Sequence, residues 1–219
     1  MRSFNLLLDK PRKQIVKIYF LIDTSDSMKG DKIATVYYSI GNLISKLRYE
    51  ADCRTDLEVI LRVMIFSNVA RWHTVERKIN DFQWFDLSCG GRGRSMGAAF
   101  KLLAIENLLE KDVILSFHPQ TVFLFTSGVS TDNFDNGLIP FLGTELGRRA
   151  IRIAIPMDND FNVSELEKFT LTKEWIVYPD SLHLLSSLTP LDDEYQRLCG
   201  NCGKLTLNYC VCECIISRP

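Results

Sequence analysis

Short apolar runs alternate with segments of helical periodicity along most of the chain, and this alternation restricts the fold more than any other feature. The first run covers residues 15–22 (IVKIYFLI), and residues 31–50 follow it with apolar side chains at steps of three and four. Residues 121–125 (TVFLF) are almost continuously apolar, as expected of a strand covered on both faces. The sequence therefore predicts an α/β fold, a doubly wound, mainly parallel sheet with about six strands and six helices.

The rest of the sequence predicts further strands and helices and indicates where the α/β domain ends. A helix is expected to begin near Gly97, after a glycine-rich turn at residues 89–97. Pro190 and the acidic residues after it separate residues 1–192, the expected α/β domain, from a cysteine-rich tail at residues 193–219. Apolar patterning predicts further strands at residues 57–66, 152–155 and 175–178, a short edge strand at residues 70–76, and helices at residues 163–169 and 181–188.

The charge balance gives the chain no general attraction for nucleic acid or membranes. Its 219 residues include 26 Lys and Arg against 27 Asp and Glu, a net charge of −1. Binding to phosphate backbones or anionic lipids would need a local basic patch. No apolar run approaches the ~18 residues of a membrane-spanning helix, and the residues before Asp9 are too few for a secretory signal. We therefore expect a cytoplasmic protein.

Three polar loops are expected to meet at one edge of the predicted sheet. They are residues 23–27 (DTSDS) after the first strand, the glycine-rich residues 90–97, and residues 126–128 (TSG) after the central strand. In open parallel sheets, ligands bind beyond the carboxyl ends of the strands, where the topology changes direction. Convergence of the three loops would make a single site.

The first of these loops carries a pattern of oxygen ligands. Asp23, Ser25 and Ser27 occupy alternate positions, so a carboxylate and two hydroxyls can direct three oxygens at a hard cation such as Mg²⁺. With the apolar strand before it and Gly30 after it, this DxSxS loop resembles the metal-ion-dependent adhesion site of the von Willebrand factor A (vWA) domain family. The resemblance covers residues 13–190. It implies a Rossmann-like fold and a protein-binding module, not an enzyme.

The second loop is similar to that of a narrower group within this family. Residues 90–100 (GGRGRSMGAAF) resemble the corresponding loop of the TerY-like bacterial proteins related to tellurite resistance. This likeness implies a phosphorylation-linked stress system, with protein partners that include a kinase or phosphatase. A partner's acidic side chain would complete the coordination of the metal, or the partner would dock around the same three loops when metal is absent.

Two positions depart from the family's pattern. Arg94 stands where the threonine of the second loop would fall, so Ser95 is the nearest hydroxyl that could replace it. Ser127 stands where the third loop of the family has an aspartate. Loss of a carboxylate and gain of a guanidinium both oppose a divalent cation. Two interpretations stay open: Mg²⁺ held by Asp23, Ser25, Ser27, Ser95 and Ser127, or a metal-free loop in which Asp23 pairs with Arg94.

A competing interpretation makes the chain a serine hydrolase. Residues 93–97 (GRSMG) satisfy the GxSxG pattern of the nucleophile elbow, with Ser95 as the nucleophile and His118 or His183 available as the base. Against it, the preceding residues 82–91 are mixed in character and interrupted by glycines, whereas an elbow follows a buried strand. The same basic turn could instead seat a phosphate group through its backbone N–H groups and arginines.

The tail carries the spacing of a metal site. A CxxC pair followed by glycine is the usual shape of a zinc knuckle, and four thiolates suffice for tetrahedral Zn²⁺. Five cysteines fall within the last 21 residues, and we favour as zinc ligands Cys199, Cys202, Cys210 and Cys212, with Cys214 as the substitute. A reactive or partly oxidised tail is the alternative. A third functional possibility is nucleic-acid binding through this tail together with Arg92 and Arg94.

Overall fold

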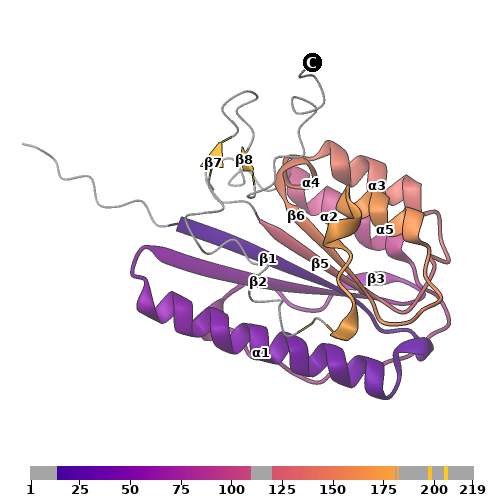
Figure 1. Ribbon diagram of the computed structural model, residues 1–219, viewed down its shortest axis with the longest axis horizontal. Helices are drawn as coiled ribbons and strands as arrows, with labels where there is room; N and C mark the ends of the chain where they lie inside the picture. The colour runs from indigo at the N-terminus through magenta and orange to yellow at the C-terminus, as the bar shows by residue number, and fades with distance from the viewer. Residues whose placement is uncertain (1–13, 110–119, 181, 183–196, 199–204, 207–219) are drawn as a thin grey trace, which may run out of the picture.

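The computed structural model describes residues 14–109, 120–180, 182, 197–198 and 205–206. Its centre is a six-stranded sheet with the order β3-β2-β1-β5-β6 (Figure 1). The sixth strand, β4, pairs with β2. The strands are β1 (Gln14–Asp23), β2 (Leu57–Phe66), β3 (Ala70–Trp72), β4 (Arg77–Lys78), β5 (Thr121–Thr126) and β6 (Ile151–Pro156). Strands β2, β1, β5 and β6 run parallel, and only β3 and β4 are antiparallel to their neighbour. The predicted α/β fold class is confirmed.

Helices cover both faces of this sheet. The long helix α1 (Asp31–Cys53) lies on one face, and the other helices lie on the opposite face (Figure 1). These others are α2 (Met96–Leu109), α3 (Phe134–Gly143), α4 (Glu145–Arg149) and α5 (Val163–Thr170). Three 3-10 segments complete the described elements: η1 (Asp26–Met28), η2 (Ile79–Asp81) and η4 (Lys173–Trp175). None of the described helices has the length and hydrophobicity needed to span a bilayer.

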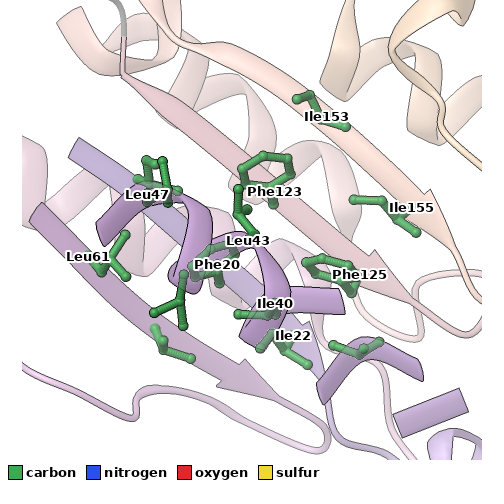
Figure 2. Packing of buried hydrophobic residues seen from close by; sticks show 14 of the residues in the cluster. Phe20, Ile22, Ile40, Leu43, Leu47, Leu61, Phe123, Phe125, Ile153 and Ile155 are labelled. Atoms are coloured by element: carbon green, nitrogen blue, oxygen red, sulfur yellow. The ribbon is translucent and has the colours of Figure 1, made fainter. Parts of the chain in front are cut away.

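Alternation along the central strands explains why their sequences are apolar throughout. In β1, Phe20 and Ile22 pack with α1 (Figure 2). Tyr19 and Leu21 pack against the helices on the other face. Successive side chains of a strand point to opposite faces, so a sheet covered on both sides needs apolar residues at every position. Helix α1 supplies its share of the core from positions three or four apart: Val36, Ile40, Leu43, Ile44 and Leu47.

The helices α2 and α3 pack closely through two glycines. A Cβ built on Gly137 would lie 1.8 Å from the carbonyl oxygen of Gly97, and one on Gly97 would lie 2.2 Å from the carbonyl oxygen of Asn133. Asp132 also accepts hydrogen bonds from the backbone N–H groups of Gly97 and Ala98 at 2.9 and 2.8 Å. This carboxylate at the start of α2 satisfies unpaired N–H groups and complements the helix dipole. It fixes α2 to the loop after β5.

One predicted strand is wrong. Residues 175–178 form no strand: Trp175 ends the 3-10 segment η4, and the only pairing with β6 is an isolated bridge between Ile176 and Ala154, among the described residues. The N–H of Val177 donates to the carbonyl oxygen of Ala154 at 2.9 Å. The next residue on the same side of a strand is Pro179, which has no N–H to donate. The ladder therefore stops after one step.

Other expectations fare differently. The strands at 15–22, 57–66, 121–125 and 152–155 and the helices at 31–50, near Gly97 and at 163–169 are confirmed within a few residues. The edge strand is shorter than expected and is followed by the separate β4. Helices α3 and α4 fall where no helix was placed, because Gly137, Pro140 and Gly143 give α3 a poor intrinsic propensity.

The tail is described only at two short strands, β7 (Arg197–Leu198) and β8 (Leu205–Thr206), which pair antiparallel. The predicted boundary at residue 192 and the expected helix at 181–188, apart from Leu182, lie outside the described residues. The proposed zinc ligands lie outside them too: Cys199, Cys202, Cys210 and Cys212, as well as Cys214.

Candidate functional site

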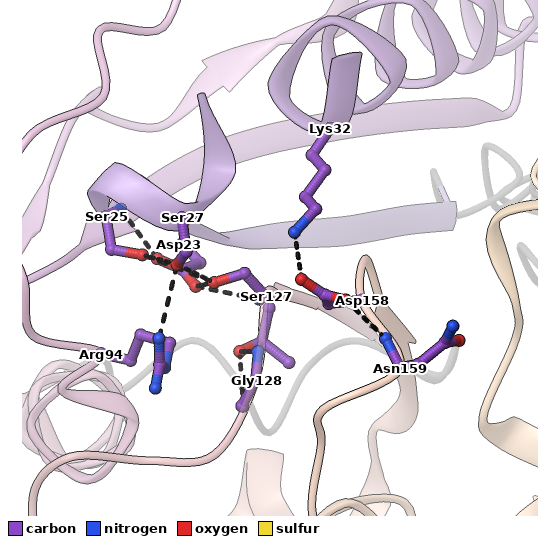
Figure 3. Close-up of polar contacts among 10 residues, drawn as sticks. Asp23, Ser25, Ser27, Lys32, Arg94, Ser127, Gly128, Asp158 and Asn159 are labelled. Carbon is purple, nitrogen blue, oxygen red and sulfur yellow. Dashed lines mark hydrogen bonds and ion pairs between the residues drawn. The ribbon is translucent and has the colours of Figure 1, made fainter. Parts of the chain in front are cut away.

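Asp23 joins two of the three predicted loops. It is the last residue of β1 and is fully buried. Its Oδ1 accepts a hydrogen bond from the backbone N–H of Ser25 at 2.8 Å. Its Oδ2 accepts from both the backbone N–H and the hydroxyl of Ser127, at 2.9 and 2.6 Å (Figure 3). Because β1 and β5 are parallel neighbours, one carboxylate at the end of β1 holds the turn after β5.

Three serine hydroxyls continue from this carboxylate as a chain. The Oγ atoms of Ser25 and Ser27 lie 2.8 Å apart, and those of Ser27 and Ser127 lie 2.6 Å apart. A hydroxyl has one hydrogen to donate, and Ser127 gives its hydrogen to Asp23. Ser127 therefore accepts from Ser27, and Ser27 accepts from Ser25. The hydrogen bonds run in a single direction and end at Asp23.

Arg94 contacts Ser27, the middle hydroxyl of this chain. Its Nη1 donates to the Ser27 Oγ at 3.4 Å, and its Nε donates to the carbonyl oxygen of Val129 at 2.8 Å. The guanidinium lies against Gly128, where a Cβ would be 3.5 Å from the Arg94 Cζ. The backbone N–H of Arg94 donates to the hydroxyl of Thr131 at 2.7 Å. The loop after β5 thus holds this arginine in place.

The hydroxyl of Ser95 points elsewhere. Its Oγ donates to the carbonyl oxygen of Asn68 at 3.0 Å, and its backbone N–H donates to the carbonyl oxygen of Ser67 at 2.9 Å. Of the five predicted metal ligands, the structure brings Asp23, Ser25, Ser27 and Ser127 into one hydrogen-bonded group and directs Ser95 to the loop after β2. Arg94 bonds to Ser27, and no ion pair of Arg94 with Asp23 is present among the described residues.

Backbone hydrogen bonds join the second loop to the first. The N–H of Asp26 donates to the carbonyl oxygen of Gly91 at 2.8 Å, and the N–H of Gly90 donates to that of Thr24 at 2.7 Å. Gly91 has a φ of 93°, a conformation that favours glycine. Asn68, which the sequence reasoning did not single out, accepts from the Gly93 N–H through its side chain at 2.7 Å. The predicted convergence of the three loops is therefore present in the structure.

A salt bridge borders this group. Lys32, near the start of α1, donates to the carboxylate of Asp158, which follows β6 (Figure 3). This hydrogen bond, together with one from the Asn159 backbone N–H and the nearby charge of Arg94, lowers the pKa of Asp158. We use the name rim for Ser27, Lys32, Arg94 and Asp158. These side chains come from the loop after β1, the start of α1, the loop before α2 and the loop after β6.

Cys89 lies beside this site and is half-buried. Burial, and after it the negative charge of Asp23, raises the pKa of its thiol. A raised pKa keeps the thiol protonated and poorly reactive at neutral pH. Cys89 therefore acts as a small, mostly apolar residue at the edge of the site.

Comparison with known proteins rests on the fold. No family model and no curated protein matches the sequence. Proximal thread matrix protein 1 from the mussel byssus is 18% identical to this chain, with a TM-score of 0.53. The match covers 81% of this chain and 47% of the mussel protein. The ArnB paralog VWA2 from Sulfolobus acidocaldarius is 19% identical, with a TM-score of 0.53, and the match covers 78% of this chain and 44% of VWA2. The SpRpn10 VWA domain is 16% identical, with a TM-score of 0.52, and the match covers 80% of this chain and 96% of that domain.

The chain has the fold of a vWA domain. It spans less than half the length of the first two proteins but nearly all of the SpRpn10 VWA domain. At identities of 16 to 19%, the likeness shows this fold and nothing narrower. The TerY-like grouping stays a prediction from the second loop.

The donor set at the centre of this vWA fold does not fit a divalent cation in its present arrangement. Both oxygens of Asp23 accept hydrogen bonds, and Ser27 accepts from Ser25 and Arg94. Mg²⁺ is usually held by one or two carboxylates and several waters, and Asp23 is the only carboxylate in this described hydrogen-bonded group. In the described part of the chain, no three His, Cys, Asp or Glu side chains gather as a metal-binding group. A guanidinium lies within hydrogen-bonding distance of a candidate ligand, which further opposes a second cation.

The structure around Ser95 lacks the features that the serine-hydrolase interpretation requires. No helix or strand lies between Asp81 and Met96, so no strand leads into Ser95. Its hydroxyl donates to a backbone carbonyl rather than to a base. The candidate bases His118 and His183 lie outside the described residues.

Proposed function

We propose that this chain is a non-enzymatic protein-interaction module that docks its partner at the rim without a divalent cation. The vWA fold and the convergence of Asp23, Ser25, Ser27 and Ser127 support a docking site at the carboxyl ends of the strands. One observation carries the second part of the proposal. The guanidinium of Arg94 donates to Ser27, so a positive charge of the protein itself lies where a metal would compete for the same oxygens.

We infer the biological setting from the second loop. Its similarity to the TerY-like group favours a bacterial tellurite-resistance or related stress system, with a kinase or phosphatase of that system as partner and with cytoplasmic location. Proximal thread matrix protein 1 has been described with a zinc-occupied MIDAS motif, at 17% identity and a TM-score of 0.51. The family's pattern has an acid in the third loop and a threonine in the second, and Ser127 and Arg94 stand at these positions here.

We further propose that the cysteine-rich tail binds one structural Zn²⁺. Its support is the spacing of Cys199, Cys202, Cys210 and Cys212. A zinc ion could fold a segment of this size that has no core of its own. The tail would then offer a second docking surface beside the vWA domain.

Capture of partners from the native host tests the docking proposal. The full chain is immobilised in buffers that contain Zn²⁺ throughout and differ only in Mg²⁺ and Mn²⁺. We expect the same proteins to be recovered in both buffers. Ser27→Tyr places a bulky ring at the rim and should abolish recovery of the proteins that dock there, whereas proteins held by the tail alone should still be recovered. Ser45→Tyr is the matched control, because Ser45 is an exposed residue of α1 far from the rim.

Two outcomes would contradict the proposal. Recovery that requires Mg²⁺ or Mn²⁺ would mean that a cation completes the site. Equal recovery by the wild type and Ser27→Tyr would mean that partners dock elsewhere.

A further inference from the structure

Arg94 has hydrogen-bonding capacity that the described residues do not use. A guanidinium carries five N–H donors in one plane. Two of them are engaged, by the carbonyl oxygen of Val129 and by the Oγ of Ser27. Within the part of the chain that the structure describes, no carboxylate forms an ion pair with Arg94. The remaining donors belong to the Nη atoms and are available to a ligand.

The described charged side chains near Arg94 already have partners of their own, so none of them neutralises its guanidinium. The ammonium group of Lys32 pairs with Asp158, and that of Lys29 pairs with Asp26 at 2.6 Å. Asp158 therefore has a closer cation than Arg94, although the charge of Arg94 still helps to lower the pKa of Asp158. Asp23 is buried and already accepts three hydrogen bonds. No acid of the described rim is left to neutralise the arginine.

The arginine is also held in a fixed position. Its Nε and Nη1 bonds fix the plane of the guanidinium, while its backbone N–H and carbonyl bond to Thr131 at 2.7 and 3.0 Å. The hydroxyl of Ser130 donates to the same carbonyl at 3.2 Å. A side chain that is ordered before binding loses less conformational entropy when a ligand arrives. Arg94 is thus prepared to receive a planar anion.

We propose that Arg94 binds a carboxylate of the partner directly, through the N–H donors that remain on its Nη atoms. This inference rests on the proposed docking at the rim and names the chemical group that is recognised there. An aspartate or glutamate side chain fits because a carboxylate and a guanidinium can share two parallel hydrogen bonds. A phosphate carries a charge of nearly −2, so Asp158, whose carboxylate interacts with the charge of Arg94, would repel it more strongly than a singly charged carboxylate. The preferred ligand is a singly charged acidic peptide.

Nuclear magnetic resonance titration of the full chain tests this proposal. The probes are the blocked peptide acetyl-Gly-Gly-Glu-Gly-Gly-amide and its analogues with glutamine or phosphoserine at the central position. We expect the glutamate peptide to shift the side-chain Nε–H signal of Arg94 and the amide signals of Ser27 and Gly128 in a saturable way. The glutamine peptide should cause no saturable shift, and the phosphoserine peptide should bind more weakly than the glutamate peptide.

Variants of the two neighbouring arginines provide the matched comparison. Arg94→Gln should remove the saturable shifts of Ser27 and Gly128, whereas Arg92→Gln should leave them unchanged, since Arg92 is an exposed residue of the same loop. Arg94→Lys keeps the charge but not the planar fork, and should weaken binding about fivefold. If Arg94→Gln disturbs signals throughout the sheet, the lysine variant decides the matter.

Three results would overturn the proposal: equal shifts with the glutamine peptide, tighter binding of the phosphoserine peptide, or loss of binding in Arg92→Gln. None of them would by itself contradict docking at the rim, because a partner could dock there through other groups. Failure of the capture experiment with Ser27→Tyr would instead remove the docking proposal and leave the peptide result standing.

Discussion

Two single residues, Arg94 and Ser127, set the charge of this site. Ser127 keeps the hydrogen bond to Asp23 but brings no charge, and Arg94 brings a positive charge to Ser27. One missing unit charge at about 4 Å corresponds to roughly 4 kcal/mol at an effective dielectric constant of about 20, before solvent and counter-ion corrections. We therefore expect these two departures from the family's pattern to weaken the affinity of the site for a divalent cation.

Restoring both positions is expected to create a magnesium site. In the double variant Arg94→Thr/Ser127→Asp, a second carboxylate and a free hydroxyl replace the guanidinium. We expect millimolar Mg²⁺ to raise the melting temperature of this variant by a few degrees, about 1 kcal/mol of stabilisation, and to leave the wild type unchanged. Differential scanning fluorimetry with and without Mg²⁺, at constant Zn²⁺, measures the effect.

Ser127→Ala with Arg94→Thr is the control for this experiment. It removes the guanidinium without adding a carboxylate, so it should not respond to Mg²⁺. A Mg²⁺-dependent rise in the wild type would show that the native site binds the cation despite Arg94.

The sequence predicted the convergence of four site residues but gave no information about the orientation of Ser95, the fifth. Asp23, Ser25, Ser27 and Ser127 could be predicted to converge because they follow parallel neighbouring strands. The Ser95 hydroxyl points to the carbonyl oxygen of Asn68, and its backbone N–H bonds to that of Ser67; both carbonyls belong to another loop. No local spacing encodes such a contact between segments.

His73 is expected to make the stability of the fold depend on pH. It packs edge-on against Phe85, with ring centroids 4.7 Å apart. Burial, and secondly the charge of Arg71, lower its pKa below the usual 6.5. The unfolded chain therefore takes up a proton before the folded one as the pH falls. The stability that His73 contributes is present above about pH 6.5 and declines below it.

The control is His73→Phe, which keeps an aromatic ring and cannot titrate. Urea unfolding at about pH 7.5 and about pH 5.5 should show a larger loss of stability in the wild type than in this variant. An identical loss in both would assign the pH dependence to other groups.

At the scale of elements, the packing of α3 against α2 depends on the close approach of the two helices at Gly97 and Gly137. The predicted helices α1 and α5 have a clear apolar face, and their periodicity could be seen in the sequence. Helix α3 carries Gly137 and Pro140, which reduce its helical propensity. Its stability comes instead from close contact with α2, and such tertiary contacts override local propensity. This is why the sequence pattern did not reveal it.

Gly137→Ala should destabilise the domain by about 2 kcal/mol or more, since overpacking usually costs about 1–3 kcal/mol. Its Cβ would lie 1.8 Å from the Gly97 carbonyl oxygen, so the two helices would have to separate. Gly143→Ala in the same helix is the control, because nothing lies within 4 Å of its Cβ position. It should stay within about 0.5 kcal/mol of the wild type. Chemical denaturation measures both, and equal effects would refute the role of close packing.

At the scale of the whole molecule, the chain order of strands and helices was enough to predict the mainly parallel sheet and the edge that carries the site. Right-handed crossovers between parallel strands leave few alternative topologies. The one misplaced strand, at residues 175–178, failed because Pro179 interrupts its ladder. A single proline thus limits the sheet beside β6 to an isolated bridge.

The cysteine-rich tail gives a prediction about composition. Full-length protein purified under reducing conditions should contain about one zinc ion per chain. Cys202→Ser should lose most of this metal, whereas Cys53→Ser should keep it, since Cys53 is an exposed residue at the end of α1. Inductively coupled plasma mass spectrometry measures the content. Zinc that persists in Cys202→Ser would rule out the proposed ligand set.

The position of Asp23 at the end of a central strand also has a mechanical consequence. Strand β1 is paired in parallel with β2 from Gln14 to Asp23, and with β5 from Ile18 to Ile22. A partner that pulls on the loop after β1 along the strand axis loads both ladders in shear, so many hydrogen bonds resist together instead of opening one after another. A tethered complex formed at this edge would be expected to release its partner before the sheet gives way.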